Sequence, residues 1–297
     1  MANMKEIQDR IRSVQDTMKI TNAMYTISSS KLKKAKKALE DTEPYYYALQ
    51  SAISRTLRHV PDLEHRYFDE RQAIQGKNRK IGYMVITGDK GMAGAYNHNV
   101  EKIAEDQMAE NDCDNYLFVL GEMGRQYFTK RNMAIDTQFH YTVQKPTMHR
   151  ARIISELMVD KFNQGELDEI YIIFTQMNNS VVMEPRMIQL LPLKKATFQV
   201  NTPAILDIHQ EEIEMVPSEE AVLDMIVPNY ITGMIYSCLV ESYSSEQNSR
   251  MIAMQNSTES AKDILRELNI SYNRARQAGI TQEITEVIGG ARAQKKK

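Results

Sequence analysis

The stretch between Gly233 and Gly279 contains neither proline nor glycine and has the composition of one unbroken helix. The helical pattern extends in both directions, over about Ser218–Ile288, with Pro228 as its only proline. At 1.5 Å per residue, roughly 70 helical residues would be about 105 Å long. A helix of that length cannot be enclosed by a compact domain of this size, so we predict that it projects, pairs with another helix, or does both.

Apolar and small residues along this stretch recur in steps of four and three, which is typical of a coiled-coil seam. The expected seam consists of Ile231, Ile235, Cys238, Ser242, Ser245, Ser249, Ala253, Ser257, Ala261, Ile264, Leu268, Tyr272 and Ala275. The steps between Ser249 and Ala261 are all of four, which predicts a stutter that relaxes the left-handed supercoil. Serine and alanine bury little apolar area, so we expect weak pairing for such a length.

The other end of the chain carries a matching pattern. Its seam consists of Ile7, Ile11, Val14, Met18, Thr21, Tyr25, Ser28, Leu32, Ala35 and Leu39. The first helix is expected to reach about Leu57, with a kink or a restart at Pro44. Two long seams at the two ends of one chain predict an antiparallel hairpin whose turn is everything in between. The alternative is that each seam is the buried stripe of an ordinary bundle helix.

The segment between the two long helices alternates strand and helix patterns. Apolar runs predict strands at Lys80–Thr87, Asn115–Leu120 and Glu169–Met177, with edge strands at Phe139–Val143 and Pro185–Leu193. Amphipathic patterns predict helices at Asn97–Glu110, Glu122–Lys130 and Thr147–Asn163. This alternation is typical of a mostly parallel sheet with helices on its faces.

The predicted fold class is therefore α/β, with a long antiparallel coiled coil of N- and C-terminal helices and an inserted Rossmann-like α/β domain. We expect the coiled-coil shaft at residues 1–60 and 210–297 and the α/β domain at residues 75–200. A polar linker, His59–Lys80, and a second connection, Asn201–Pro217, join them. The second connection carries an acidic run at Glu211, Glu212 and Glu214.

One loop has the position of a phosphate-binding loop but lacks the matching spacing. The segment Thr87–Gly94 follows a predicted strand and precedes a predicted helix, yet no Lys-Ser/Thr pair follows Gly94. Its glycines are three residues apart, which also excludes the dinucleotide-binding spacing, so we interpret the segment as a tight turn. The histidines show no metal-ligand spacing, and no serine nucleophile motif occurs. We predict no catalytic residue, no cofactor and no metal.

The charge and the cysteine content of the 297 residues narrow the functional classes to which the protein could belong. A net charge of −2 gives no overall attraction to nucleic acid or anionic lipid. Cys113 and Cys238 form neither a zinc motif nor a disulfide framework and fit a reducing compartment. The charged, helical start is unlike a signal peptide, and no run of 18 uninterrupted apolar residues predicts a membrane span.

Three stretches resemble the gamma subunit of F-type ATP synthase. The opening helix, KEIQDRIRSVQDTMKITNAMYTISSSKLKKA, and the turn ITGDKGMAGAYN are similar to family segments, with departures at Met92, Ala93 and Ala95. The end of the chain, Ile280–Ala291, fits the family signature I-T-x-E-x-x-[DE]-x-x-x-G-A. RMIAMQNSTESA is similar to the segment that precedes this signature, so the similarity spans the whole chain.

The resemblance implies a non-catalytic subunit that acts as the central rotor shaft of the proton-transporting ATP synthase. The family's coiled coil lies in a hexamer of alpha and beta subunits, and its α/β domain sits beside the epsilon subunit on the membrane c-ring. Rotation of that ring drives ATP synthesis at the beta subunits. In the reverse direction, ATP hydrolysis at the beta subunits drives rotation of the ring. The expected location is peripheral, on the cytoplasmic face of the cell membrane.

The resemblance also implies contacts with the beta subunits. Arg276 and Gln277 match a family pair that contacts a beta-subunit loop, and Met24 is expected to face this region from the opposite helix. A lysine run on the first helix is expected to face acidic groups of the beta subunits or to lie near the ring; its proposed contact residues are Lys33, Lys34, Lys36 and Lys37. The same run is open to the simpler interpretation of a solvated helix face.

Two alternative functions would have different consequences that can be measured. A coiled-coil scaffold or nucleic-acid-binding protein with an α/β domain would use the lysine run and bind DNA with steep salt dependence. An α/β enzyme with helical appendages would have a pocket lined by titratable groups with perturbed pKa values.

Overall fold

The computed structural model describes residues 4–177, 179, 182–198 and 215–294, with side chains described up to residue 291. The acidic run at Glu211, Glu212 and Glu214 lies outside the described residues. Contacts divide the chain into two compact units. The first comprises residues 1–29 and 250–297, and the second comprises residues 30–249.

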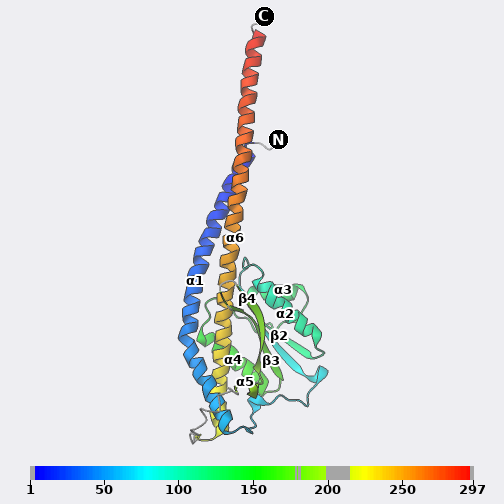
Figure 1. Cartoon of the computed structure of the whole chain (residues 1–297). Helices are drawn as coiled ribbons and strands as arrows, with labels where there is room; N and C mark the ends of the chain where they lie inside the picture. The colour runs from blue at the N-terminus through cyan, green and yellow to red at the C-terminus, as the bar shows by residue number, and fades with distance from the viewer. Residues whose placement is uncertain (1–3, 178, 180–181, 199–214, 295–297) are drawn as a thin grey trace. The chain divides into compact units, whose positions relative to one another are not determined.

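Ten helices and strands make up the regular structure of the described residues (Figure 1). The helices are α1 Met4–His59, α2 Tyr96–Glu110, α3 Glu122–Lys130, α4 Met148–Asn163, α5 Lys195–Phe198 and α6 Glu219–Gln294. The strands are β1 Lys80–Ile86, β2 Asp114–Leu120, β3 Glu169–Met177 and β4 Met183–Leu191. Two short 3₁₀ turns, Arg66–Phe68 and Gly76–Asn78, lie between α1 and β1.

In the first unit, α1 and α6 pair as antiparallel helices. The Thr21 and Thr258 hydroxyls are hydrogen-bonded at 2.7 Å. Met18 and Leu265 line the same hollow. Since Met18 precedes Thr21 whereas Leu265 follows Thr258, the two helices run in opposite directions. The predicted antiparallel coiled coil is confirmed. Every seam position predicted on α1 is buried or half-buried.

The seam on α6 differs from the predicted one after Arg250. Ser257 is exposed and Ile264 is 43% exposed, whereas their neighbours Thr258 and Leu265 point into the pairing. From Met254 onward, the buried and half-buried series is Met254, Thr258, Ala261, Leu265, Leu268, Tyr272 and Ala275, with steps that alternate between four and three. Just before it, Met251, Ile252 and the predicted Ala253 are half-buried, and the buried Arg250 stands four residues before Met254. The steps of four therefore end at Thr258 and do not extend to Ala261 as predicted. The prediction failed because serine, threonine and alanine give almost no contrast between neighbouring positions.

In the second unit, a four-stranded sheet has the order β2-β1-β3-β4. Strand β1 pairs in parallel with β2 and β3, and β4 runs antiparallel at the edge, as predicted for a mostly parallel sheet. Alternate residues of β1 enter two different cores: Tyr83 and Val85 pack with α2 and α3, whereas Met84 and Ile86 pack with α4, α6 and α1. Burial on both faces explains the continuous apolar run of β1.

The second unit corrects three predictions of secondary structure. Residues 139–143 form no strand, although Phe139 and Val143 are each 1% exposed and fill the core. Helix α1 continues through Pro44 without the restart that was one of the two alternatives there, and Leu39 and Tyr46 on either side of it pack against the core. The last strand begins at Met183 rather than Pro185.

The predicted seam residues Ser242, Ser245 and Ser249 lie on the face of α6 that contacts α2 and the sheet. The Ser245 hydroxyl donates to the Thr175 carbonyl oxygen of β3 at 3.0 Å. Helix α1 meets α6 on another face, where the Tyr46 and Tyr230 hydroxyls lie 3.0 Å apart. A helix buried on several sides has more than one stripe, and periodicity alone does not say which element each stripe contacts.

The polar linker after α1 is tied to the sheet by two arginines. Arg71 donates to the carbonyl oxygens of Phe162 (2.7 Å) and Leu167 (3.0 Å) and pairs with Asp168 (3.0 Å). Arg79 pairs with Glu169 at the start of β3. The linker is therefore ordered by charge-assisted contacts, even though it carries little regular structure.

Helix α6 is long and apolar enough, by length and composition alone, to cross a membrane. One 18-residue stretch has a mean hydropathy of 1.3, and 56% of that stretch is buried inside the protein. The core helix of a globular protein passes the same test, so this single helix is weak evidence for a span.

Candidate interaction surfaces and the strand-end crevice

The sheet has one place where an open α/β fold normally binds a ligand. In such sheets the site lies at the carboxyl ends of the strands, where the strand order reverses. Here the chain leaves β1 for β2 on one side and returns to β3 on the other, so the reversal lies between β1 and β3. Thr87 and Gly88 follow β1, and Thr175 lies at the same end of β3. We call this place the strand-end crevice.

Helix α6 occupies the strand-end crevice. The Ser245 hydroxyl reaches the Thr175 carbonyl oxygen, and the Ser242 hydroxyl lies 2.7 Å from the Tyr96 hydroxyl at the start of α2. A Cβ atom added to Gly88 would lie 3.1 Å from a Glu246 carboxylate oxygen. Ser242 and Ser245 are fully buried. The crevice is thus filled by the chain's own helix, with an acidic side chain against its glycine.

The turn after β1 also uses its polar groups internally. The Gly88 amide donates to the Asn97 side-chain oxygen at 2.7 Å, and the Thr87 hydroxyl donates to the Leu120 carbonyl oxygen at 2.8 Å. The Asp89 carboxylate accepts the Val143 and Gln144 amides at 3.2 and 3.3 Å. The segment leads into α2 as a turn in which the Gly88 amide and the Thr87 and Asp89 side chains are engaged within the chain.

The structure places Arg276 and Gln277 side by side on α6 and does not bring Met24 to them. Both side chains are exposed, and Met24 is half-buried on α1. The Thr21–Thr258 hydrogen bond sets Met24 opposite the region of Gln255. Arg276 lies 21 residues beyond that region in the sequence, which is about 32 Å along the helix. The expectation that Met24 faces the Arg276 region is therefore wrong, because the alignment of α1 and α6 separates the two residues along the helix axis.

A further exposed stripe on α6 was not among the predicted site residues. Ile280, Ile284, Val287 and Ile288 are each 48–72% exposed. Their spacing of four, three and one places them on one side of the helix. The signal was present in the sequence, since these apolar residues stand where no partner seam on α1 remains. Apolar side chains in such a row are typical of an interaction surface.

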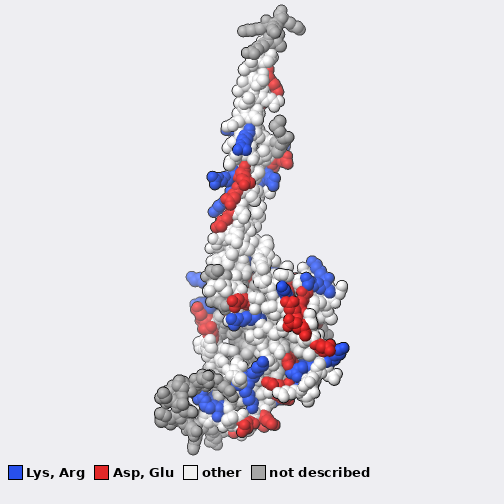
Figure 2. Space-filling view, turned by 45° about the vertical axis from the view of Figure 1, so that its right-hand side comes forward, with Lys and Arg blue, Asp and Glu red and all other residues white. Residues whose placement is uncertain are grey.

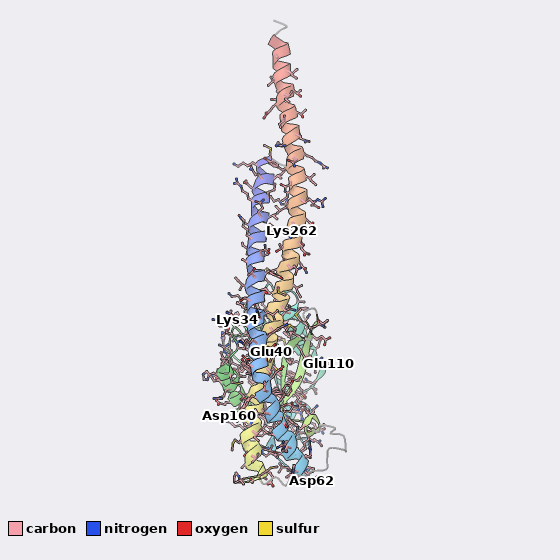
Figure 3. All side chains as sticks on the ribbon, turned by 60° about the vertical axis from the view of Figure 1, so that its left-hand side comes forward. Lys34, Glu40, Asp62, Glu110, Asp160 and Lys262 are labelled. Carbon is pink, nitrogen blue, oxygen red and sulfur yellow. The ribbon has the colours of Figure 1, made fainter. Side chains whose placement is uncertain are left out.

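The lysine run lies on the outside of α1 in the second unit. Leu32 is half-buried and Ala35 is 6% exposed, so the helix turns the lysines outward (Figure 3, where Lys34 is labelled). Within the described part of the chain, none of Lys31, Lys33, Lys34, Lys36 and Lys37 forms an ion pair with a carboxylate. On the face shown in Figure 2, acidic and basic side chains are interspersed, which does not resemble a continuous nucleic-acid-binding stripe.

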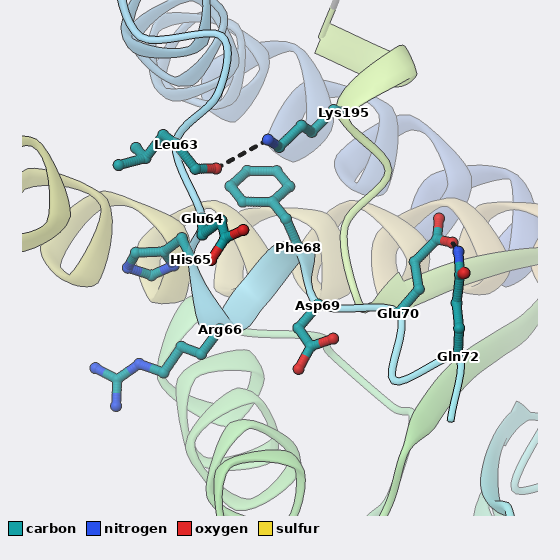
Figure 4. Close-up of a pocket in the computed structure, with 9 residues that line it drawn as sticks. All are labelled: Leu63, Glu64, His65, Arg66, Phe68, Asp69, Glu70, Gln72 and Lys195. Carbon is teal, nitrogen blue, oxygen red and sulfur yellow. Dashed lines mark hydrogen bonds between the residues drawn. The ribbon is translucent and has the colours of Figure 1, made fainter. Parts of the chain in front are cut away.

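One hollow of about 690 Å³ lies beside the linker (Figure 4). Its two cations are already engaged: Lys195 donates to the Leu63 carbonyl oxygen at 2.8 Å, and Arg66 pairs with Asp224. The remaining charged residues that line it are acidic. The described residues that line this hollow offer neither an unengaged cation for a phosphate nor a nucleophile beside a base.

The most perturbed carboxyl group lies elsewhere, under α3. Glu101 of α2 is 4% exposed, and burial raises its pKa from 4.5 to about 7. The nearby Glu105 carboxylate adds to the rise and the Arg131 guanidinium opposes it. Glu105 accepts a hydrogen bond from the Tyr127 hydroxyl at 3.0 Å. Neither carboxylate is among the described residues that line the hollow of Figure 4.

Comparison with known proteins gives consistent matches over the full length. The family model described as ATP synthase matches residues 3–294. The ATP synthase gamma chain of Ruminiclostridium cellulolyticum is 44% identical over 98% of both chains, and that of Acetivibrio thermocellus is 44% identical over 99% of this chain and 100% of its own. A chain in the central stalk and c-ring of the Tetrahymena thermophila mitochondrial ATP synthase has a TM-score of 0.59. That chain is 20% identical, with 80% of this chain and 98% of its own covered, so this likeness concerns the fold.

Proposed function

This chain belongs to the ATP synthase gamma chain family, and on that premise we propose that its part in catalysis is mechanical, with no catalytic site of its own. It is a subunit of the F-type ATP synthase and belongs to the central stalk of that complex. As the rotor shaft, it couples proton-driven rotation of the membrane ring to ATP synthesis or hydrolysis at the beta subunits.

The observation that carries the non-catalytic proposal is the occupied strand-end crevice. A nucleotide at that place would need free backbone amides and a cation near the strand ends. The chain instead presents Ser242, Ser245 and the Glu246 carboxylate there, and α6 would have to leave its buried position to admit a phosphate.

Calorimetric titration of the isolated chain with Mg-ATP tests this part of the proposal. We expect no saturable heat. A saturable site in the micromolar range that Gly88→Ala or Gly94→Ala abolishes would contradict it. A titration of the isolated beta subunit, which is expected to bind Mg-ATP, shows that the assay detects a site.

The partners follow from the complex. Membership of an ATP synthase supports association with the catalytic sector and with the c-ring. We further propose that the tip of α6 and its exposed row from Ile280 to Ile288 lie within the hexamer of alpha and beta subunits. Arg276 and Gln277, exposed and adjacent, are positioned to contact a beta-subunit loop, since a guanidinium and an amide both bind a carboxylate with directional hydrogen bonds. The lysines at positions 33, 34, 36 and 37, which form no ion pair with a carboxylate in the described part of the chain, face acidic groups of beta subunits or lie near the ring.

Met24 is proposed as a separate contact with a beta subunit, because the coiled coil places it about 32 Å from Arg276 along the helix axis. The proposed functional division assigns residues 1–60 and 210–297 to the shaft and residues 75–200 to the α/β domain beside the epsilon subunit. The complex is associated with a membrane, and we propose the cytoplasmic face of the cell membrane as the location of this subunit.

A further inference from the structure

The segment Ser242–Asn248 of α6 is polar except for Tyr243, yet all of it is buried. The six polar residues, Ser242, Ser244, Ser245, Glu246, Gln247 and Asn248, are each exposed by 4% or less. A helix in a globular protein normally turns such residues toward solvent. Here the segment lies between α1 and the sheet within the second unit (Figure 1). Burying a polar side chain without a hydrogen-bond partner is unfavourable. The hydrogen-bond partners of this segment therefore indicate its structural role.

The partners on the sheet side belong to three different elements. The Ser242 hydroxyl meets the Tyr96 hydroxyl of α2 at 2.7 Å, and the Ser245 hydroxyl donates to the Thr175 carbonyl oxygen of β3 at 3.0 Å. One turn further along, the Ser249 hydroxyl lies 3.2 Å from the Met183 sulfur of β4. The three serines are three and four residues apart, so they share one face of α6. That face is therefore hydrogen-bonded to the rest of the second unit at three successive positions along the helix axis.

We infer that these three contacts form a register lock that keeps α6 from turning or sliding against the sheet while the helix carries torque. The register lock consists of Ser242, Ser245 and Ser249 with their partners on α2, β3 and β4. The inference rests on the proposed function as a rotor shaft, in which force applied at the ring must reach the tip of α6. The serines are positioning residues in this role, because they act through the helix and touch no nucleotide.

The physical reason is the directionality of hydrogen bonds. Apolar contact is not directional, and a helix surface of small side chains can shift against a flat sheet without losing much buried area. A shift of α6 by one residue moves its side chains by 1.5 Å and turns them by 100°. Each hydroxyl of the lock would then leave hydrogen-bonding distance, and those of the buried Ser242 and Ser245 would lose their partners inside the protein, which is unfavourable. The register is therefore well defined, whereas an apolar face would allow slippage.

Two other hydroxyl hydrogen bonds of α6 supply matched controls. The Thr232 hydroxyl, on a residue 7% exposed, donates to the Pro228 carbonyl oxygen of its own helix at 2.9 Å. The Tyr46 and Tyr230 hydroxyls join α6 to α1 rather than to the sheet. Removing either changes a buried polar group on or beside α6 and leaves every contact of the register lock in place.

The test compares a Tyr96→Phe/Ser245→Ala chain with the wild type and with Thr232→Val and Tyr46→Phe. Each chain is assembled into the complete ATP synthase in sealed vesicles. ATP hydrolysis and ion transport are measured in the same preparation, with and without an opposing ion gradient. We expect the Tyr96→Phe/Ser245→Ala complex to hydrolyse ATP near the wild-type rate while transport per ATP falls, most of all against the gradient. The control variants should keep wild-type transport per ATP.

Each outcome decides the inference. Unchanged transport per ATP in the Tyr96→Phe/Ser245→Ala complex overturns the register lock. An equal loss in the Thr232→Val complex also overturns it, since the effect would then be general to buried hydroxyls of α6. If the double variant does not assemble, Tyr96→Phe alone is measured in its place, because it removes one oxygen and keeps the ring. A wild-type complex that fails to couple transport to hydrolysis through this chain would instead refute the rotor function itself.

Discussion

Replacing Glu101 by glutamine should stabilise the chain at alkaline pH and have little effect at acid pH. The carboxyl group is almost fully enclosed on α2, with Glu105 as a neighbouring like charge and Arg131 as a partial counter-charge. Its pKa is raised from 4.5 to about 7 in the folded chain. An acid whose pKa is raised by folding holds its proton more tightly in the folded state, so the folded state is favoured at low pH.

The sign and the size of the effect of Glu101→Gln on stability follow from the difference between the ordinary pKa of the carboxyl group and its pKa in the folded chain. The stabilising contribution is complete below about pH 4.5 and is lost as the pH rises through about 7, where the buried carboxyl must ionise. The gap between the two pKa values corresponds to at most about 3 kcal/mol of stability. Glutamine has a similar size and never ionises, so Glu101→Gln should recover up to about 3 kcal/mol at about pH 8.5 and much less at about pH 5.

Urea unfolding of the purified chain at these two pH values measures the difference, and hydrogen exchange of the α2 amides reports it locally. The matched control is Asp106→Asn, which removes an exposed carboxylate from the same helix and should give no comparable pH-dependent gain. A gain of the same size at both pH values would mean that packing, not ionisation, explains the effect. No gain at alkaline pH would show that Glu101 is not forced to ionise in a buried state.

Other substitutions test the turn and the proposed partner surfaces. Gly121→Ala should destabilise the chain by about 3 kcal/mol or more in urea unfolding, because the new Cβ would lie 2.3 Å from a backbone oxygen at a φ of +88°. Gly94→Ala, at a φ of +57° with open space around it, should cost clearly less. Arg276→Ala with Gln277→Ala should slow ATP turnover of the complex under load while the melting temperature of the isolated chain stays unchanged, and wild-type turnover would refute the contact. Neutralising the four proposed contact lysines within residues 33–37 should lower ATP-driven ion transport most at low salt, since exposed charges are screened, and a salt-independent effect would count against charge pairing.

Local pattern was sufficient for most of the framework. The seam on α1 is predicted at every position, because large apolar residues such as Ile7 and Leu39 alternate with charged ones and leave one possible stripe. The strands β1, β2 and β3 are similarly clear, since continuous apolar runs bounded by polar residues occur where a parallel sheet is buried on both faces. The absence of a phosphate-loop spacing could also be read directly from the order of glycines after Thr87.

The candidate site shows where such reasoning stops. Arg276 and Gln277 were found through the resemblance of their neighbours to a family signature, and their exposure agrees with a contact surface. Met24 was assigned to the same place, but the distance between them depends on how α1 and α6 are aligned. That alignment is set by pairs such as Thr21 with Thr258, which are far apart in the sequence.

The sequence by itself determined that the chain has two long helices and an α/β segment, because periodicity of 3.6 and runs of apolar residues are local properties. Only the tertiary structure decided that Ser242 and Ser245 face the sheet and that α6 fills the strand-end crevice. A serine in a helix has nearly the same local preference whether it faces water, another helix or a strand. What distinguishes these environments is the partner atom, here the Tyr96 hydroxyl and the Thr175 carbonyl oxygen, and each is brought there by a part of the chain about 70 to 146 residues away.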